Sequence, residues 1–367
     1  MSLFIDSHQD IAFNLLSLQR DYRHSVLETR KNEQDSDIPA EVGQALLGWP
    51  EYQKANLALI FGTLFILPNS KVTPLTVKYT YDSFVKAKKL YQAEIDLYHN
   101  LAQQSPDMFR LILCKSDLNS LIDVWKDSPA QYPQHTNPVG IVILMEGAEG
   151  IANPAELNGW WEQGLRMVGP VWDGGRFCGS STQPGTFTNE GKDLLRVMSE
   201  LGMALDISHM DTQSTIYALD HFNGQVFASH ANVLNLVPGF QSERLFKDET
   251  IRGLIDRDSV MGIMPVNFFL KAGWHSGDDR SVISINLMLN HIDYVCQLAG
   301  SARHVAIGTD FDGGLGLRDV PYEINSISDI QLISTGLENR GYQTAEIDAI
   351  CYGNWLRMLE RILPLNG

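Results

Sequence analysis

The stretch FIDSHQD, residues 4–10, begins as an apolar run and ends in titratable groups at alternate positions, Asp6, His8 and Asp10. An extended backbone points alternate side chains to the same side, so His8 and Asp10 face one point. An imidazole nitrogen and a carboxylate oxygen form a mixed ligand set that suits Zn²⁺ or a similar divalent cation. The stretch therefore predicts a buried strand whose end carries candidate metal ligands.

The same pattern, an apolar run with a polar end, recurs along the chain. Eight such runs alternate with segments of helical periodicity, at residues 3–6, 57–66, 140–147, 165–171, 203–208, 225–230, 259–266 and 304–310. Runs that are almost continuously apolar are typical of strands covered on both faces, as in parallel sheets. The alternation predicts an α/β fold, a (β/α)8 TIM-type barrel with helical and loop insertions.

We expect one domain over residues 1–367, because no Pro/Gly/Ser linker or change of composition divides the chain. Insertions are expected at residues 21–49, which are polar and irregular by pattern, and at residues 78–104, which have the pattern of a long helix. A doubly wound sheet would call for a G-x-G-x-x-G turn after an early strand, and the chain has none there.

The composition excludes several classes of function. The 28 basic and 44 acidic residues give a net charge of -16, whose field would repel nucleic acid. The longest apolar run, residues 57–67, is too short to cross a membrane, and the N-terminus lacks the pattern of a secretory signal. The four cysteines lie far apart without a C-x-x-C pair, which indicates a reducing compartment. A cytoplasmic location is the expectation.

In a parallel barrel the C-terminal ends of all strands open onto one face. The polar residues at or just after the predicted strand ends should therefore converge; they are His8, Asp10, Glu146, His209, His230 and Asp310. A single buried histidine is as readily a packed, hydrogen-bonded side chain as a ligand. A buried cluster of acids and imidazoles without a partner, however, would be costly to desolvate.

These residues are more ligands than one tetrahedral ion needs, so we expect two divalent cations about 3.5 to 4 Å apart with Glu146 as the bridge. Such a pair would turn a shared water into hydroxide and polarise a carbonyl, which indicates hydrolysis of an amide or ester. Asp310, in GTDFDGG (308–314), is the candidate acid/base that passes a proton to the leaving amine. Asp312 is interpreted as a capping or turn residue.

The chain resembles the membrane (renal) dipeptidase family, two-zinc peptidases with an amidohydrolase-type barrel. The resemblance rests on DSHQD (6–10), DSDIP (35–39), MEGAEGI (145–151), ELGMALDISHM (200–210), VFASHANV (226–233) and HVAIGTDFDGG (304–314). It implies that His8 and Asp10 bind one zinc, that His209 and His230 bind the other, and that Glu146 binds both. Asp310 would be the family's acid/base aspartate, and the substrate a dipeptide with a free C-terminal carboxylate.

The resemblance also implies substrate-binding residues. Arg244, in SERLFKDE (242–249), matches an arginine that grips the substrate carboxylate; without the resemblance, a surface ion pair with Glu243 or Asp248 is the better reading. Two positions depart from the family pattern. Trp172 stands where the fourth strand usually ends in a histidine that binds the scissile carbonyl, and Phe269 stands where a tyrosine is common. Both replace polar groups by apolar surface and indicate an altered substrate or a slow enzyme.

Three functions are therefore carried forward. The first is a binuclear zinc metallodipeptidase, for which the resemblance is compatible with a homodimer. The second is an amidohydrolase that acts on another small amide, an N-acyl amino acid or a lactone. The third is a metal-binding homologue without catalysis. Of the other histidines, His291 and His304 are expected at the end of the barrel opposite the site, and His275 on the side of the site.

Overall fold

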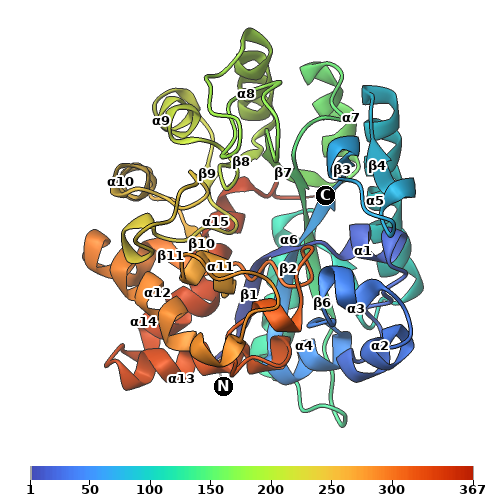
Figure 1. The fold of residues 1–367 in the computed structure, drawn as a ribbon, viewed down its shortest axis with the longest axis vertical. Helices are drawn as coiled ribbons and strands as arrows, with labels where there is room; N and C mark the ends of the chain where they lie inside the picture. Colours follow the sequence, from blue (N-terminus) through green and yellow to red (C-terminus); the bar gives the residue numbers. More distant parts are fainter. Residues whose placement is uncertain (1, 367) are drawn as a thin grey trace.

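Parallel strands alternate with helices around a central axis in the computed structural model, which describes residues 2–366 (Figure 1). The eight predicted strands are all present in these residues, and we keep their numbering along the chain: β1 (Phe4–Gln9), β2 (Leu57–Phe65), β6 (Val139–Glu146), β7 (Leu165–Gly169), β8 (Ala204–Asp206), β9 (Val226–Phe227), β10 (Met261–Ile263) and β11 (Val305–Ile307). The predicted α/β class with a TIM-type barrel is confirmed.

Six of these strands form one parallel sheet in the order β1-β2-β6-β7-β8-β9, and β10 pairs with β11. A parallel bridge between Ala228 and Met261 connects the two groups. The short strand β5 (Phe109–Leu111) pairs with the first half of β6, and β3 (Leu67–Pro68) pairs with β4 (Thr80–Tyr81) outside the barrel. The strand order thus follows the chain around the barrel, as expected for repeated right-handed crossovers.

Side chains, rather than a strand ladder, connect β11 to β1. The Ser7 hydroxyl donates to the backbone oxygen of Ile307 at 3.0 Å and to that of Ser229 at 2.5 Å. The Asp6 carboxylate accepts from the backbone N–H of Thr309 at 2.7 Å and from its hydroxyl at 2.6 Å. The first strand, whose sequence carries these polar groups, therefore closes the barrel at the end where the site lies.

Aromatic side chains fill the interior. Phe61 of β2 and Phe227 of β9 lie in strands separated by three others in the sheet, yet their ring centres are 6.2 Å apart. Trp355 packs on both rings, at 5.3 and 6.0 Å, and its indole N–H donates to the oxygen of Ile307 at 2.9 Å. The strands curl around a packed core, which is the general property of small parallel barrels.

Helices cover the outer face of the strands (Figure 1). In chain order they are α1 (Ile11–Ser17), α2 (Val26–Glu33), α3 (Ile38–Val42), α4 (Trp49–Ala55), α5 (Phe84–Gln104), α6 (Lys115–Asp127), α7 (Leu157–Glu162), α8 (Asn189–Leu201), α9 (Thr212–His221), α10 (Asp248–Asp256), α11 (Asn267–Leu270), α12 (Ile285–Ala299), α13 (Gln331–Asn339), α14 (Thr344–Asp348) and α15 (Asn354–Ile362). None of these helices is both long and apolar enough to span a membrane.

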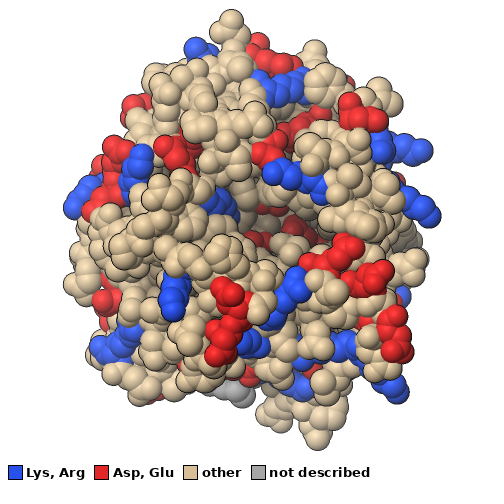
Figure 2. Space-filling model, viewed as in Figure 1, with Lys and Arg blue, Asp and Glu red and all other residues tan. Residues whose placement is uncertain are grey.

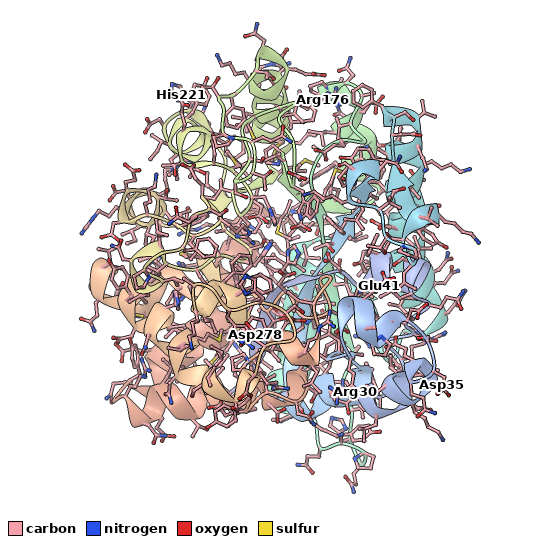
Figure 3. The ribbon with its side chains drawn as sticks, viewed as in Figure 1. Arg30, Asp35, Glu41, Arg176, His221 and Asp278 are labelled. Carbon is pink, nitrogen blue, oxygen red and sulfur yellow. The ribbon has the colours of Figure 1, made fainter. Side chains whose placement is uncertain are left out.

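The two predicted insertions differ from expectation in detail. The helix expected over residues 78–104 begins only at Phe84, because the Ser83 hydroxyl accepts from the backbone N–H of Lys86 and caps it there. Residues 21–49, expected to be irregular, contain α2 and α3, whose residues Arg30 and Glu41 are labelled in Figure 3. Few side chains of these helices are buried, so their sequences lack the repeating apolar face that would have predicted them.

Several strands, β8 and β9 among them, are shorter than the apolar runs that predict them. The run at 203–208 gives β8 of three residues, and the run at 225–230 gives β9 of two. Beyond them, Oδ1 of Asp206 accepts from the backbone N–H groups of Ser208 at 3.1 Å and Ser229 at 3.0 Å. A buried carboxylate thus takes over the hydrogen bonds of the ladder, and the chain turns inward with the site residues.

Candidate metal centre

Six side chains from five strand ends converge at the C-terminal opening of the barrel. His8 lies in β1 and Asp10 just after it, Glu146 ends β6, and the loops after β8, β9 and β11 supply His209, His230 and Asp310. Glu146 lies in the middle. Its Oε1 is 2.8 Å from Nε2 of His209 and 3.5 Å from Nε2 of His230, and its Oε2 is 3.5 Å from Nε2 of His8.

Three overlapping sets of ligand atoms lie within 4.8 Å of one another in the described residues. They are His8 with Asp10 and Glu146, Glu146 with His209 and His230, and His8 with His230 and Asp310. Nε2 of His8 is buried and has no hydrogen-bond partner, although it lies 3.6 Å from Asp10 and 3.8 Å from Asp310. A buried imidazole nitrogen without a partner fits a ligand position, so the donor set suits a divalent metal centre.

The electrostatics of the cluster call for positive charge at its centre. Burial would raise the pKa of Glu146, but the imidazoles of His8 and His209 hold it below its usual range. Burial would lower the pKa of His8, yet the charges of Glu146, Asp10 and Asp310 raise it to about 10. Burial raises the pKa of Asp310 well above its usual range; His8 opposes this, and the other carboxylates add to it. Either protons or divalent cations can neutralise the negative charge of the carboxylates in such a cluster.

A cavity of about 400 Å³ adjoins this cluster, and Trp172, His209, Arg244 and Phe269 all line it. Figure 2 shows the molecular face hollowed at its centre, with acidic side chains at the base of the hollow. Phe240, Phe268 and Trp274 add further aromatic surface. The cavity thus joins a polar floor to aromatic walls, which is the usual composition of a small-molecule site.

Arg244 is buried at the wall of this cavity, with 6% of its surface exposed. Its Nη1 donates to the backbone oxygen of Ser208 at 2.9 Å, and its guanidinium lies 5.3 Å from the centre of the Phe269 ring. The alternative of a surface ion pair is wrong, because Glu243 instead accepts from the backbone of Thr212 and lies near Lys247. A fixed guanidinium at the wall can bind an anionic group of a ligand.

Trp172 lines the cavity beside His209 of the cluster and Phe65 of β2. Its ring centre is 5.1 Å from that of Phe65 and 6.2 Å from that of His209. Phe269 packs edge-on against Phe268 at 4.5 Å. Both positions that depart from the family pattern therefore face the same cavity and narrow it with apolar surface.

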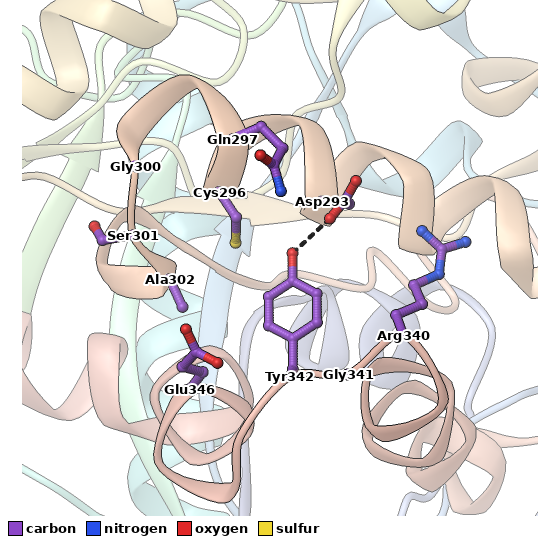
Figure 4. Close-up of a pocket in the computed structure, with 10 residues that line it drawn as sticks. All are labelled: Asp293, Cys296, Gln297, Gly300, Ser301, Ala302, Arg340, Gly341, Tyr342 and Glu346. Carbon is purple, nitrogen blue, oxygen red and sulfur yellow. Dashed lines mark hydrogen bonds between the residues drawn. The ribbon is translucent and has the colours of Figure 1, made fainter.

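A second cavity, of about 340 Å³, lies among α12, α13 and α14, away from these residues (Figure 4). The Tyr342 hydroxyl donates to Asp293 at 2.8 Å across it, and burial raises the pKa of the Cys296 thiol to about 11. None of the metal-ligand sets in the described residues includes a residue of this cavity.

Comparison with known proteins decides the family. Residues 1–364 match the membrane dipeptidase family, peptidase family M19. The chain belongs to this family. The predicted resemblance is confirmed, and membership in the M19 family makes the protein a metal-dependent hydrolase.

Individual M19 relatives and neighbours are distant. The uncharacterized protein in pqqA 5'region of Klebsiella pneumoniae is 30% identical over 61% of this chain and 82% of its own. Dipeptidase ataJ of Aspergillus terreus is 23% identical over 98% of this chain and 84% of its own. A metallo peptidase from Rhodobacter sphaeroides, liganded with a phosphinate mimic of the dipeptide L-Ala-D-Ala, has a TM-score of 0.76 at 20% identity, with 99% of this chain and 100% of that chain covered. The last likeness shows the shared fold.

Three other residues considered from the sequence, Asp312, His275 and His291, lie outside the cluster. Asp312 is buried, and its carboxylate accepts from the backbone N–H of Leu46 at 2.8 Å and from the Tyr22 hydroxyl at 3.2 Å, so it anchors the first insertion rather than the loop that follows it. His275 is 82% exposed at the side chain and lies near Asp278. The prediction for His291 is wrong: its Nδ1 accepts from the backbone N–H of Val233 at 3.0 Å, close to the site loop after β9.

Sequence reasoning missed the supporting residues Asp206 and Ser229. Both are buried; Asp206 stands three residues before His209 in LDISH (205–209), and Ser229 directly precedes His230 in ASH (228–230). The signal was present as a polar residue inside an apolar run, where burial without a partner would be costly.

Proposed function

We propose that this M19 protein is a binuclear zinc metallodipeptidase, which hydrolyses dipeptides with a free C-terminal carboxylate. The observation that carries the proposal is the position of Glu146, with one oxygen facing His209 and His230 and the other facing His8. The resemblance, with His8 and Asp10 for one ion and His209 and His230 for the other, supports the same division. Two divalent cations bound there would activate a water and polarise the scissile carbonyl.

Asp310 is the proposed acid/base. Its carboxylate faces the cluster, with Oδ1 3.8 Å from Nε2 of His8, and its side chain keeps 13% exposure toward the opening. Burial raises its pKa, so it holds a proton more readily than an ordinary aspartate. In the proposed reaction Asp310 takes a proton from the attacking water and delivers it to the leaving amine.

Arg244 is the proposed clamp for the substrate carboxylate. Its Nη1 is engaged by Ser208, which fixes the guanidinium and leaves its other N–H groups for the ligand. Arg244 and His209 line the same cavity, so a carboxylate held at Arg244 would place the preceding peptide bond toward the cluster. The aromatic walls at Trp172 and Phe269 favour an apolar side chain on the C-terminal residue.

A second candidate function, hydrolysis of another small amide such as an N-acyl amino acid or a lactone, draws on the same walls. The indole of Trp172 has one N–H and cannot carry the positive charge that a histidine offers an oxyanion. An amide whose hydrolysis depends less on that charge would therefore fit better. A cytoplasmic location is proposed as well, since Cys114, Cys178, Cys296 and Cys351 are all free, buried thiols.

Zinc content and a substrate panel test the proposal. We expect two zinc ions per chain and turnover of dipeptides, with Asp310→Asn slower by roughly 10²- to 10⁴-fold. Asp220→Asn, on the exposed side of α9, is the matched control and should retain full activity. A fully zinc-loaded enzyme that turns over no dipeptide would refute the proposal.

Trp172→His separates the two candidate functions. An increase in dipeptide turnover, together with a decrease for N-acyl amino acids, would show that the tryptophan has adapted the site to the second class of substrate. Unchanged or lower dipeptide turnover in this variant supports the dipeptidase.

A further inference from the structure

One hydroxyl lies beneath two of the proposed ligand histidines. Oγ of Ser229 is 2.8 Å from Nδ1 of His230 and 3.4 Å from Nδ1 of His8, whose ring centres are 3.8 Å apart. On its other side the same oxygen is 2.5 Å from Oδ2 of Asp206. Ser229 is completely buried and Asp206 is 3% exposed, so water does not compete for these contacts.

The direction of these hydrogen bonds follows from the donors available. Oδ1 of Asp206 accepts from two backbone N–H groups, of Ser208 and Ser229, and from the Ser208 hydroxyl at 2.6 Å. An ionised carboxylate only accepts, so the single proton of the Ser229 hydroxyl points to Oδ2 of Asp206. The lone pairs of Ser229 then face the histidines. His230 must therefore carry its proton on Nδ1, so its Nε2, which lies 3.0 Å from Nε2 of His209, carries none.

The backbone around Ser229 is fixed as well. Its oxygen accepts from the Ser7 hydroxyl at 2.5 Å. A Cβ on Gly262 would lie 2.1 Å from the backbone oxygen of Ser229, and a Cβ on Gly308 would lie 1.9 Å from it. Glycine at both positions therefore allows β10 and the end of β11 to approach Ser229 closely. The barrel thus fixes the backbone of Ser229 from below and keeps its hydroxyl oxygen between Asp206 and the two histidines.

We propose that Asp206 and Ser229 form a positioning pair that sets the tautomer of His230 and accepts from Nδ1 of His8 beside it, so that both Nε2 atoms face the cation positions. The inference deepens the proposed metal site and rests on it. Outer partners of ligand histidines fix the ring orientation, and their loss typically costs about 10- to 100-fold in metal affinity. Here one hydroxyl serves a histidine on each side of Glu146.

Asp206→Asn is the decisive variant, because it keeps the shape and reverses the hydrogen bonds. The two backbone N–H groups at Oδ1 demand an acceptor, so the amide oxygen takes that place and the amide NH₂ faces Ser229. The amide then donates to Ser229, and the Ser229 hydroxyl donates to Nδ1 of His230. The proton of His230 moves to Nε2, which blocks the ligand atom without removing any side chain near the cluster.

The tautomers are measured on metal-free protein labelled with ¹⁵N-histidine, by two-bond ¹H–¹⁵N correlation spectra, with His230 assigned from His230→Gln. We expect Nδ1–H in the wild type and Nε2–H in Asp206→Asn, with zinc affinity in a chelator competition lowered by about 10- to 100-fold. Ser229→Ala removes the acceptor and should give a mixture of tautomers. Thr215→Val, which loses a buried hydroxyl of α9 that makes no hydrogen bond within residues 2–366, should keep both tautomer and affinity.

A wild-type His230 with its proton on Nε2 would overturn the inference whatever the variants do, so the test does not depend on their folding. A folded Asp206→Asn that keeps Nδ1–H and wild-type zinc affinity would overturn it too. A wild type that binds no zinc would refute the proposed function instead, and the tautomer of the metal-free protein would still decide this inference.

Discussion

Replacement of Gly308 by alanine should damage both the barrel and the site. The added Cβ would lie 1.9 Å from the backbone oxygen of Ser229 and 2.7 Å from Oγ of Ser7, whereas an ordinary contact begins at 3.4 Å. The backbone must therefore open by about 1.5 Å, because the nearer atom belongs to a carbonyl that cannot rotate away. Gly308 also donates to the oxygen of Ile263 at 3.1 Å, which holds β11 on β10.

Overpacking of a close-packed interior typically costs 1 to 3 kcal/mol, and a clash with backbone belongs at the upper end, so we expect Gly308→Ala to lose about 3 kcal/mol of unfolding free energy. Urea denaturation measures it. Because Ser229 would move away from His230, zinc affinity should also fall by at least about tenfold.

Gly159→Ala is the matched control for Gly308→Ala. Gly159 lies in α7 with no atom within 4 Å of an added Cβ, so this variant should gain about 0.5 to 1 kcal/mol. If the urea midpoint of Gly308→Ala equals that of the wild type, the inferred close contact between Gly308 and Ser229 is wrong.

Two more predictions concern acid stability and substrate recognition. Burial lowers the pKa of His291 to about 4 from its ordinary 6.5. The unfolded chain therefore takes up a proton below pH 6.5 and the folded chain does not until about pH 4. Stability is complete above that window and falls within it, by about 2 kcal/mol from pH 7 to pH 4.5, and His291→Gln should lack this loss in urea titrations at the two pH values. Arg244→Leu should raise the KM for dipeptides by about 10- to 100-fold, as expected for the loss of a charge-assisted hydrogen bond.

Each of these two predictions has its own control. For His291→Gln, the exposed His221, which stacks on Tyr217 and is labelled in Figure 3, provides the comparison: His221→Gln should leave the acid loss in place. Equal acid losses in wild type and His291→Gln would contradict the first prediction. For Arg244→Leu, dipeptide amides lack the carboxylate and should be affected little; an equal rise in KM for both substrates would contradict the clamp.

The barrel and the candidate ligands could be predicted from local sequence patterns. An apolar run with a polar end can be recognised from neighbouring residues alone, because the spacing of apolar residues indicates a buried strand. Parallel strands in a barrel then bring their C-terminal ends to one face. For this reason His8, Glu146 and His230 could be assigned to one site although they stand 84 or more positions apart in the sequence. The helical segments at α8 and α9 were visible for the same reason, since a repeating apolar face identifies a helix.

Only the tertiary structure decided which atoms meet. Arg244 could be a surface residue or a buried one by its own sequence, and its burial against Phe269 depends on how the loops fold over the opening. The Ser7 hydroxyl reaches Ser229 across 222 positions and Ile307 across 300. Such contacts depend on strand register and on two glycines that let backbones approach, and no local pattern contains that distance information. The pairing of Asp206 with Ser229, which orients the histidines, exists only once the barrel has closed.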